Sequence, residues 1–260
     1  MIITDRFVYV HEPKTGGTFV TSVLLRVHGI EWTRLTQLLT VLRSENRWRG
    51  PFGDFVYQNN KHGTCNQVPP RYRDHLATIR HPLDLYASEY EFGWWKRRGM
   101  LRYYRAIPDF ATRFPTFPDL RFEEYVALAN LAFRSPRERT RPDAPGAMTE
   151  RFVRYYCRDP LAVMQRLNEP QGSAEDVRRD LHDITFLRTN GLNRQLHAFL
   201  GRMGYPDDVL AFIPTLGRVL PQGKGRPMDR PWQSYYSPEL LQSVRESESV
   251  LFDLFPDFDT

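Results

Sequence analysis

The chain has 260 residues, of which 41% are hydrophobic and 26% are charged, and its formal net charge is +5. That balance is typical of a globular protein and excludes a disordered or fibrous chain, while the basic excess is too small to demand a nucleic-acid partner. No apolar run approaches the ~20 residues of a membrane span, and two cysteines cannot build a disulfide framework, so we expect a cytoplasmic protein.

Short apolar strands alternate with helices along the chain. Strands are predicted at residues 7–11, 54–58, 75–80 and 184–187. Helices are predicted at residues 19–27, 35–42, 83–96, 122–133, 150–157, 160–167, 174–181 and 192–200, and from residue 238 onward. Proline-rich stretches at residues 107–118, 135–146 and 221–227 are predicted as loops. This order indicates an α/β, P-loop-like three-layer fold with a central, mainly parallel sheet flanked by helices, in a single domain over residues 1–260.

The first predicted strand leads into the turn Pro13-Lys14-Thr15-Gly16-Gly17-Thr18. In an open α/β sheet, ligands bind at the carboxyl ends of the strands. The two glycines allow close backbone approach, and the helix that follows presents free N–H groups and a partial positive charge. Lys14 adds a full positive charge, and Thr15 and Thr18 add hydroxyl donors. The turn therefore predicts a site for a phosphate-like or sulfate-like anion, with an ordinary tight turn as the alternative.

A nucleotide-hydrolysing P-loop is the nearest rival motif. It requires the order G-x-x-x-x-G-K-[ST], in which the lysine and the metal-binding hydroxyl follow the last glycine. Here Lys14 precedes both glycines, and the loop is shorter. No later predicted strand ends in a clear metal-binding aspartate, so a magnesium–nucleotide site fits poorly and we expect no metal.

A second anion site is predicted after the strand at residues 75–80. Arg80 ends this strand, Pro82 starts the next helix, and Ser88 lies on the second turn of that helix. The planar guanidinium of arginine makes bidentate contacts to phosphate, so Arg80 and Ser88 together suit one anionic group. Two such sites, one in each strand–helix turn, imply a ligand with two separate anionic groups.

The segment at residues 7–18 resembles the 5′-phosphosulfate loop of sulfotransferases that use 3′-phosphoadenosine 5′-phosphosulfate (PAPS). Ile79-Arg80-His81-Pro82 with Ser88 resembles the 3′-phosphate site of that family, and is most similar to its carbohydrate (Golgi-type) branch and bacterial relatives. By this resemblance, Arg80 and Ser88 hold the 3′-phosphate. The residues that hold the phosphosulfate are Lys14, Thr15, Gly16, Gly17 and Thr18. The resemblance also implies metal-free sulfuryl transfer, with Lys14 stabilising the charge of the leaving adenosine 3′,5′-bisphosphate.

A further, less specific match lies near the end of the chain. The basic loop Lys224-Gly225-Arg226 is similar to the late loop that closes over the cofactor in this family. The cofactor motifs then lie within residues 5–100 and 184–258, and we expect residues 97–183 to build the acceptor site. Because Met1 stands directly before the first strand, we expect a bacterial-type enzyme rather than a membrane-anchored Golgi enzyme.

A hydroxyl acceptor needs a general base whose pKa lies near neutrality, and His62 is the first candidate. It lies between the strands predicted at residues 54–58 and 75–80, so we expect it near the same sheet edge. His62 and Gly63 also resemble the His–Gly element that serves as the base in uronyl 2-O-sulfotransferases. An exposed loop histidine is the alternative interpretation. His11 directly precedes the turn, and we expect it to have a buried, orienting role rather than to transfer a proton. The remaining candidates for the base are Glu12 and Glu89.

Aromatic and basic side chains gather around the end of the helix predicted at residues 83–96. Aromatic faces beside cations suit a sugar or an already anionic acceptor, although aromatic residues at helical spacing are also typical of a core. Glu12 adds a negative charge where the family more often has an apolar residue. The residues expected to bind the acceptor are Glu12, Trp94, Trp95 and Arg98.

We therefore expect a PAPS-dependent sulfotransferase that modifies a hydroxyl of a carbohydrate, glycolipid or secondary-metabolite acceptor, with no nucleic-acid partner. Two other functions stay open at this point. A nucleotide kinase or NTPase would require magnesium and bind ATP. A noncatalytic anion-binding protein would show salt-sensitive binding without turnover.

Overall fold

The chain divides into two compact units, each built from two segments. The computed structural model describes residues 1–31, 33, 43, 45–58, 62–133, 144–217, 219, 226–227 and 229–259. The sheet unit comprises Met1–Arg80 and His182–Gly223, and the helical unit comprises His81–Leu181 and Lys224–Thr260. The helix predicted at residues 35–42 and most of the loops predicted at 135–146 and 221–227 lie outside the described residues.

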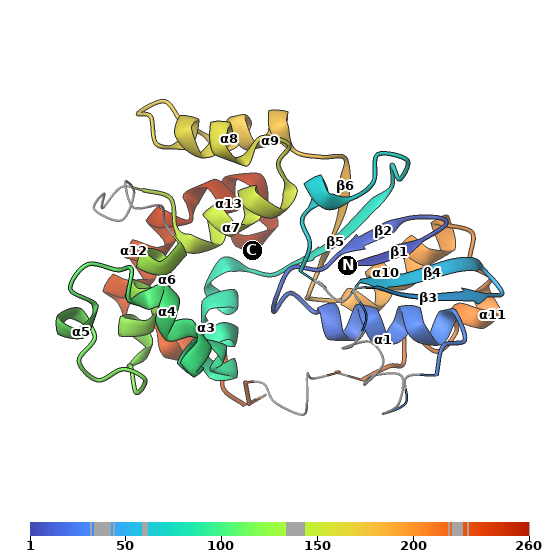
Figure 1. Ribbon diagram of the computed structural model, residues 1–260, viewed down its shortest axis with the longest axis horizontal. Helices are drawn as coiled ribbons and strands as arrows, with labels where there is room; N and C mark the ends of the chain where they lie inside the picture. Colours follow the sequence, from blue (N-terminus) through green and yellow to red (C-terminus); the bar gives the residue numbers. More distant parts are fainter. Residues whose placement is uncertain are drawn as a thin grey trace. The chain divides into compact units, whose positions relative to one another are not determined.

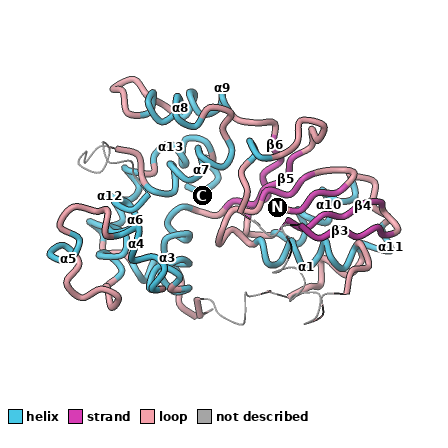
Figure 2. Tube along the Cα trace, in the orientation of Figure 1, coloured by secondary structure: helices cyan, strands magenta, loops and turns pink. Residues whose placement is uncertain are grey.

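Every strand that the structure describes belongs to the sheet unit, and these strands are the magenta segments of Figure 2. They are β1 (Ile2–Thr4), β2 (Val8–Val10), β3 (Glu45–Gly50), β4 (Gly53–Gln58), β5 (His75–Ile79) and β6 (Ile184–Arg188). They form one six-stranded sheet in the order β3-β4-β1-β2-β5-β6. The single sheet flanked by helices confirms the predicted α/β class.

The sheet is mixed, so the prediction of a mainly parallel sheet is wrong. Among the described strands, the β2–β5 and β5–β6 pairs are parallel, whereas β1–β2, β1–β4 and β3–β4 are antiparallel. Tight hairpins at residues 5–7 and 51–52 create the antiparallel half, because short connections join only antiparallel strands. The strands β1 and β3 were not predicted, since β1 has three residues and β3 carries mostly polar ones.

One apolar core packs the sheet against α1 (Gly17–Val27) and α10 (Leu192–Arg202), and it includes residues near α11 (Asp207–Leu210). Figure 1 shows α1 running along the strands. The edge of the Phe7 ring meets the face of Phe199, with ring centroids 5.0 Å apart. Each fully buried aliphatic or aromatic side chain contributes about 1.5–3 kcal/mol. This packing determines where α1 and α10 begin, and so positions the loops that precede them.

The helical unit contains no strand among its described residues. Its helices are α3 (Pro82–Phe92), α4 (Leu101–Tyr104), α5 (Phe110–Arg113), α6 (Phe122–Phe133), α7 (Ala147–Tyr156), α8 (Pro160–Leu167), α9 (Ala174–Asp180), α12 (Pro238–Ser247) and α13 (Ser249–Leu254). The N-cap of α12 is confirmed, because Ser237 Oγ accepts a hydrogen bond from the N–H of Leu240. Among the described helices, none is long and apolar enough to cross a membrane.

Two predicted boundaries in the helical unit are wrong. The helix predicted at residues 83–96 ends at Phe92, because Gly93 takes a left-handed conformation (φ 66°) and stops the helix. Residues 107–118 are not loop throughout, since they include α5. Helices α6 and α8, by contrast, begin and end where they were predicted.

Glu248 is a buried carboxylate that caps the start of α7. It lies between α12 and α13 and accepts hydrogen bonds from Tyr86 Oη (2.6 Å), Met148 N–H (3.0 Å), Thr149 N–H (2.8 Å) and the Thr149 hydroxyl (2.7 Å). A Cβ on Gly146 would lie 2.1 Å from Glu248 Oε1, so the carboxylate occupies space that a glycine leaves open. Desolvation by burial raises the pKa of Glu248, and its hydrogen bonds oppose that rise.

Glu89 is a second buried carboxylate of the helical unit. Its side chain pairs with Arg151 of α7 at 2.5 Å and accepts a hydrogen bond from Tyr125 Oη at 3.0 Å. Both charged side chains are almost completely buried, which is tolerated because each has a charged partner. Glu89 therefore joins α3, α6 and α7, a structural role that takes it out of the candidates for the base.

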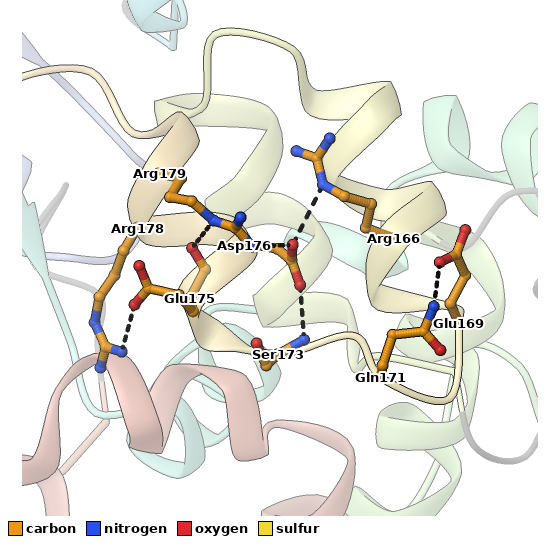
Figure 3. A network of polar contacts seen from close by, with 8 residues as sticks. All are labelled: Arg166, Glu169, Gln171, Ser173, Glu175, Asp176, Arg178 and Arg179. Atoms are coloured by element: carbon orange, nitrogen blue, oxygen red, sulfur yellow. Dashed lines mark hydrogen bonds and ion pairs between the residues drawn. The ribbon is translucent and has the colours of Figure 1, made fainter.

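An ion-pair network closes the hairpin of α8 and α9 (Figure 3). Asp176 accepts a hydrogen bond from the N–H of Ser173 at 3.0 Å and pairs with Arg179 (2.8 Å) and Arg166 (3.5 Å). Ser173 and Asp176 form a capping box, so the same carboxylate starts α9 and ties it to α8. Exposed pairs of this kind contribute about 0.2–1 kcal/mol each.

Candidate functional site

The carboxyl ends of three neighbouring parallel strands, β2, β5 and β6, meet at one edge of the sheet. β2 leads into residues 11–16 before α1, and β6 leads into residues 189–191 before α10. The N–H of Thr189 donates to the carbonyl of Ile79 at 3.0 Å, which joins the ends of β5 and β6. This is the edge at which open α/β sheets bind ligands.

Two residues with left-handed backbone shape the turn at residues 13–18. Gly16 has φ 100°, which glycine adopts freely, whereas Lys14 has φ 66°, which costs a lysine about 1–2 kcal/mol. A Cβ on Gly16 would lie 2.9 Å from Leu192 Cδ2, so the start of α10 packs against the turn. Helix α1 begins at Gly17, and its first N–H groups have no acceptor within the helix. The turn thus has the geometry of an anion-binding helix start.

The imidazole of His11 lies against Gly17. A Cβ on Gly17 would lie 1.8 Å from His11 Nε2, so a side chain at position 17 would displace the imidazole from its place. The His11 ring stacks on the ring of Tyr9, with centroids 5.8 Å apart. His11 is therefore a packing residue of the helix start, which fits an orienting role better than proton transfer.

A chain of buried hydroxyls holds the turn to the sheet. Tyr9 Oη lies 2.9 Å from Thr78 Oγ1, which lies 2.9 Å from Thr15 Oγ1. The Thr15 hydroxyl also donates to the carbonyl of Glu12 at 2.9 Å. All three hydroxyl-bearing residues are fully buried, and desolvation raises the pKa of Tyr9. Thr15, predicted to bind the phosphosulfate, thus uses its side chain to anchor the turn, and Thr78 is a site residue that the motif did not indicate.

Arg80 lies against the turn rather than apart from it. Its Nη1 donates to the carbonyl of Lys14 at 3.1 Å, across 66 positions of sequence. Within the sheet unit, the structure therefore brings Arg80 of the second predicted motif against the turn of the first. One guanidinium both supports the strained residue of the turn and adds a second positive charge to this edge.

His62 lies beside His11, as a position at the same sheet edge requires. Its Nδ1 is 3.2 Å from the carbonyl of His11, and the two imidazole centroids are 4.9 Å apart. A nitrogen that donates to a carbonyl carries the proton, so Nε2 of His62 holds the lone pair. In this neutral tautomer, Nε2 rather than Nδ1 is the ring nitrogen able to take up a proton.

The turn between β6 and α10 is closed by Gln195, which the sequence did not single out. Its Oε1 accepts from the N–H of Arg188 at 2.9 Å, and its Nε2 donates to the carbonyl of Asn190 at 2.7 Å. Gly191, with φ 67°, precedes the first residue of α10. A glutamine one turn into a helix that follows a strand is the sequence signal for this closure.

The other predicted cofactor residues belong to the helical unit. Ser88 is a buried residue of α3. Arg226 pairs with Asp84 in the first turn of α3, with Nη1 2.5 Å from Oδ1. Lys224 and Gly225 lie outside the described residues.

The four residues predicted to bind the acceptor have different surroundings. Glu12 is buried in the sheet unit, and its carbonyl supports Thr15. Trp95 is 1% exposed and packs on Tyr125, with centroids 5.1 Å apart, so it is a core residue of the helical unit and not an acceptor contact. Trp94 is half-buried, and Arg98 is exposed.

The described residues hold no group of three or more histidine, cysteine, aspartate or glutamate side chains placed to bind a metal ion. Comparisons of the chain with protein-family models, with curated proteins and with solved structures found no match. The functional argument therefore rests on the geometry of the turn and its neighbours.

Proposed function

We propose that the protein is a sulfotransferase that takes its sulfuryl group from PAPS and transfers it to a hydroxyl of a carbohydrate, glycolipid or secondary-metabolite acceptor. The observation that carries the proposal is the contact of Arg80 with the carbonyl of Lys14. The contact sets the guanidinium of Arg80 against the turn that carries Lys14 and precedes α1, which supports a single ligand for the two resembling motifs. A P-loop-like three-layer architecture belongs to the same proposal.

The donors at this edge suit a phosphosulfate group. Lys14 carries an ammonium, and Gly17 and Thr18 offer the first N–H groups of α1. The guanidinium of Arg80 is the group that the resemblance gives to the 3′-phosphate. Lys14 has a left-handed backbone that strains a lysine and would not strain a glycine. Because an ordinary tight turn would be more stable with glycine here, the lysine favours a functional role for its ammonium.

PAPS would supply an activated sulfuryl group attached to a phosphate leaving group. Lys14 and the N–H groups of the helix start then stabilise the negative charge that develops during transfer, which is the largest contribution in such reactions. His62 takes the proton of the acceptor hydroxyl at Nε2, since Nδ1 is held by the carbonyl of His11. Ser88, Lys224, Gly225 and Arg226 stay predicted cofactor residues of the helical unit.

Calorimetric titration with adenosine 3′,5′-bisphosphate tests the proposal. We expect metal-free binding of the wild type, weakened at least tenfold by Lys14→Ala and by Arg80→Ala, because each removes a charge-assisted contact. Arg49→Ala is the matched control, since Arg49 is an exposed cation of the sheet unit paired with Asp54 and removed from the turn. His62→Gln should retain bisphosphate binding and lose turnover in a screen of carbohydrate acceptors with labelled PAPS.

Two outcomes would overturn the proposal. Preference for ATP with magnesium over the bisphosphate would favour the kinase or NTPase alternative. Equal losses for Lys14→Ala and Arg49→Ala would show that net charge alone drives binding, as in a noncatalytic anion-binding protein.

A further inference from the structure

Six exposed cations lie within eighteen residues of the helical unit, between residues 96 and 113. They are Lys96, Arg97, Arg98, Arg102, Arg105 and Arg113. Asp109 is the single acidic residue of this stretch. We call these six side chains the basic surface.

The positive charges of the basic surface are not balanced by ion pairs among the described residues. Within the part of the chain that the structure describes, none of its six cations pairs with a carboxylate. Several exposed arginines elsewhere in the same unit do pair. Arg121 lies 2.7 Å from Glu123, Arg178 lies 3.5 Å from Glu175, and Arg230 lies 3.3 Å from Glu91. Arg154 of the same unit is exposed and, among the described residues, also has no carboxylate partner, so what distinguishes this surface is the run of six such cations in one stretch.

An aromatic cluster, in which Trp95 and Tyr104 are buried and Phe110 and Phe117 are half-buried, underlies the basic surface. Phe117 contacts Trp95, Tyr104 and Phe110, with ring centroids 6.1, 5.6 and 5.4 Å apart. The ring of Tyr104 in α4 also stacks on the ring of Phe110 in α5, with centroids 5.8 Å apart, so the two short helices pack on the same aromatic side chains. The cations therefore lie on a segment that is already packed before any ligand binds. Binding then does not have to supply the free energy of ordering this backbone.

Three of the cations lie on or directly before one helical stretch. Arg102 and Arg105 are three positions apart on the helical stretch from Met100 to Arg105, and Arg98 lies in the 3-10 turn Arg98–Met100 directly before it. We call these three side chains the arginine row. Residues three positions apart on a helix lie on one face, about 5–6 Å from one another at Cβ. Like charges in this arrangement repel and destabilise the helix unless anions lie between or over them.

From these observations we infer that the basic surface is a docking site for an anionic polysaccharide, with sulfate or carboxylate groups contacted by the arginine row. Five of the six cations are arginines, whose planar forks match sulfate and carboxylate oxygens. Tyr103 is 52% exposed between them, and the guanidinium of Arg102 lies 4.7 Å from the centre of its ring. The exposed tyrosine adds an amphipathic face against which a sugar ring can pack.

Other polyanions fit this surface less well. Tyr103 is the single large apolar side chain exposed in this stretch among the described residues, which leaves little to insert into a lipid surface. Single-stranded RNA binds by stacking successive bases on several aromatic side chains, and one exposed ring does not provide that. The inference is independent of sulfuryl transfer, since it needs neither the turn at residues 13–18 nor any cofactor.

The test compares two triple variants that remove the same charge. R98Q/R102Q/R105Q removes the row, and R121Q/R178Q/R230Q removes three exposed, paired arginines of the same unit. Binding of heparin and of polygalacturonate is measured by calorimetry over a range of salt concentrations, with polyuridylic acid and phosphatidylserine vesicles as competing probes. Circular dichroism and thermal unfolding check that both variants are folded.

We expect the wild type to bind heparin or polygalacturonate more tightly than polyuridylic acid or the vesicles. The row variant should lose at least tenfold in affinity and show a clearly shallower salt dependence, whereas the paired-arginine variant should lose less than threefold. Equal losses in the two variants would overturn the inference, as would tighter binding of polyuridylic acid or vesicles, or no polysaccharide binding by the folded wild type. If the row variant does not fold, Arg102→Glu alone should still lower the affinity at least threefold. Failure of this test leaves bisphosphate binding unaffected, so the two proposals are judged separately.

Discussion

The sheet unit and the helical unit place their buried polar groups in different ways. In the sheet unit, the candidate site is held by neutral hydroxyls of Tyr9, Thr78 and Thr15 and by backbone groups. In the helical unit, buried carboxylates tie helices together, as Glu248 does with α7. Burying a charge is costly unless it is fully hydrogen-bonded, so the helical unit depends on a few irreplaceable residues. The sheet unit adds one charged contact, from the guanidinium of Arg80 to the carbonyl of Lys14, to an anchoring made mostly of weaker, uncharged hydrogen bonds.

Removal of the Glu248 carboxylate should have the largest effect and sharpen this contrast. Glu248→Ala leaves the N–H groups of Met148 and Thr149 and the Thr149 hydroxyl without their acceptor, at a cost of about 3–5 kcal/mol. Tyr86 Oη loses its bond to Glu248 and keeps Asn130 Oδ1 as an acceptor. Denaturant unfolding gives the loss, and hydrogen exchange should place it in α7 and its neighbours. Glu248→Gln, which keeps the size and one acceptor oxygen, should lose less. A uniform rise in exchange over both units would break the contrast.

The stability of the sheet unit is expected to depend on pH, through one buried histidine. His28 is 2% exposed and contacts Tyr205 Oη at 2.9 Å, and burial lowers its pKa to about 4. Between pH 6.5 and 4, His28 is protonated in the unfolded chain but stays neutral in the folded chain. Stability is therefore expected to fall by about 3 kcal/mol as the pH drops through that range.

Urea unfolding at several pH values measures this fall. His28→Gln removes the titrating group and should flatten the pH dependence in that window. His197→Gln, on α10 of the same unit, is the matched control and should keep the wild-type fall. A wild type whose stability is constant from pH 6.5 to 4 would refute the assignment to His28.

The hydroxyl chain of the site should give a smaller effect on stability with a measurable effect on binding. Thr78→Val has nearly the same shape but leaves Tyr9 and Thr15 without their shared partner, at a cost of about 1–3 kcal/mol. Under the proposed function, adenosine 3′,5′-bisphosphate should also bind more weakly, because the turn loses its anchor. Thr78→Ser retains the hydroxyl and should recover both properties. Equal behaviour of the serine and valine variants would mean that the hydroxyl chain does not support the turn.

The smallest expected effect concerns Arg226 in the helical unit. Its guanidinium pairs with Asp84. Under the proposed function the same guanidinium binds the cofactor, so the carboxylate would compete with that ligand. Asp84→Asn should raise bisphosphate affinity about two- to fivefold, a gain of up to about 1 kcal/mol that titration calorimetry can detect. Glu91→Gln, which releases Arg230 from the same helix, should change nothing. Weaker binding by Asp84→Asn would show that the pair supports the site.

Local patterns made the candidate site of the sheet unit predictable. The strand, glycine turn and helix start lie within twenty residues, so apolar periodicity and turn chemistry indicate them directly. The contact of His62 with His11 spans 51 positions and depends on the packing of intervening strands. Its place at the sheet edge was predicted, but the atom that carries the proton follows from the contact alone. Thr78 looked like an ordinary strand residue, because a buried hydroxyl has no sequence signature.

The helical unit was predictable as a set of helices and not as an arrangement. Its helix boundaries follow caps and apolar spacing, as at Ser237. The pairs that hold it, Glu89 with Arg151 and Glu248 with Thr149, lie 62 and 99 positions apart. Long-range pairing of charges cannot be inferred from one sequence, since every carboxylate has many possible partners. The mixed sheet was missed for a related reason, because β3 is stabilised by its partner β4 rather than by its own composition.

The contact between His11 and Gly17 has a consequence for how such sequences vary. The imidazole of His11 occupies the space that a side chain at position 17, the first residue of α1, would need. The residue types at positions 11 and 17 are therefore expected to depend on each other. Any related chain with a side chain at position 17 should carry a small residue at position 11, and a chain with histidine at 11 should keep glycine at 17. Correlated substitution at positions 11 and 17 would distinguish chains that fold into this turn from chains that share only its sequence pattern.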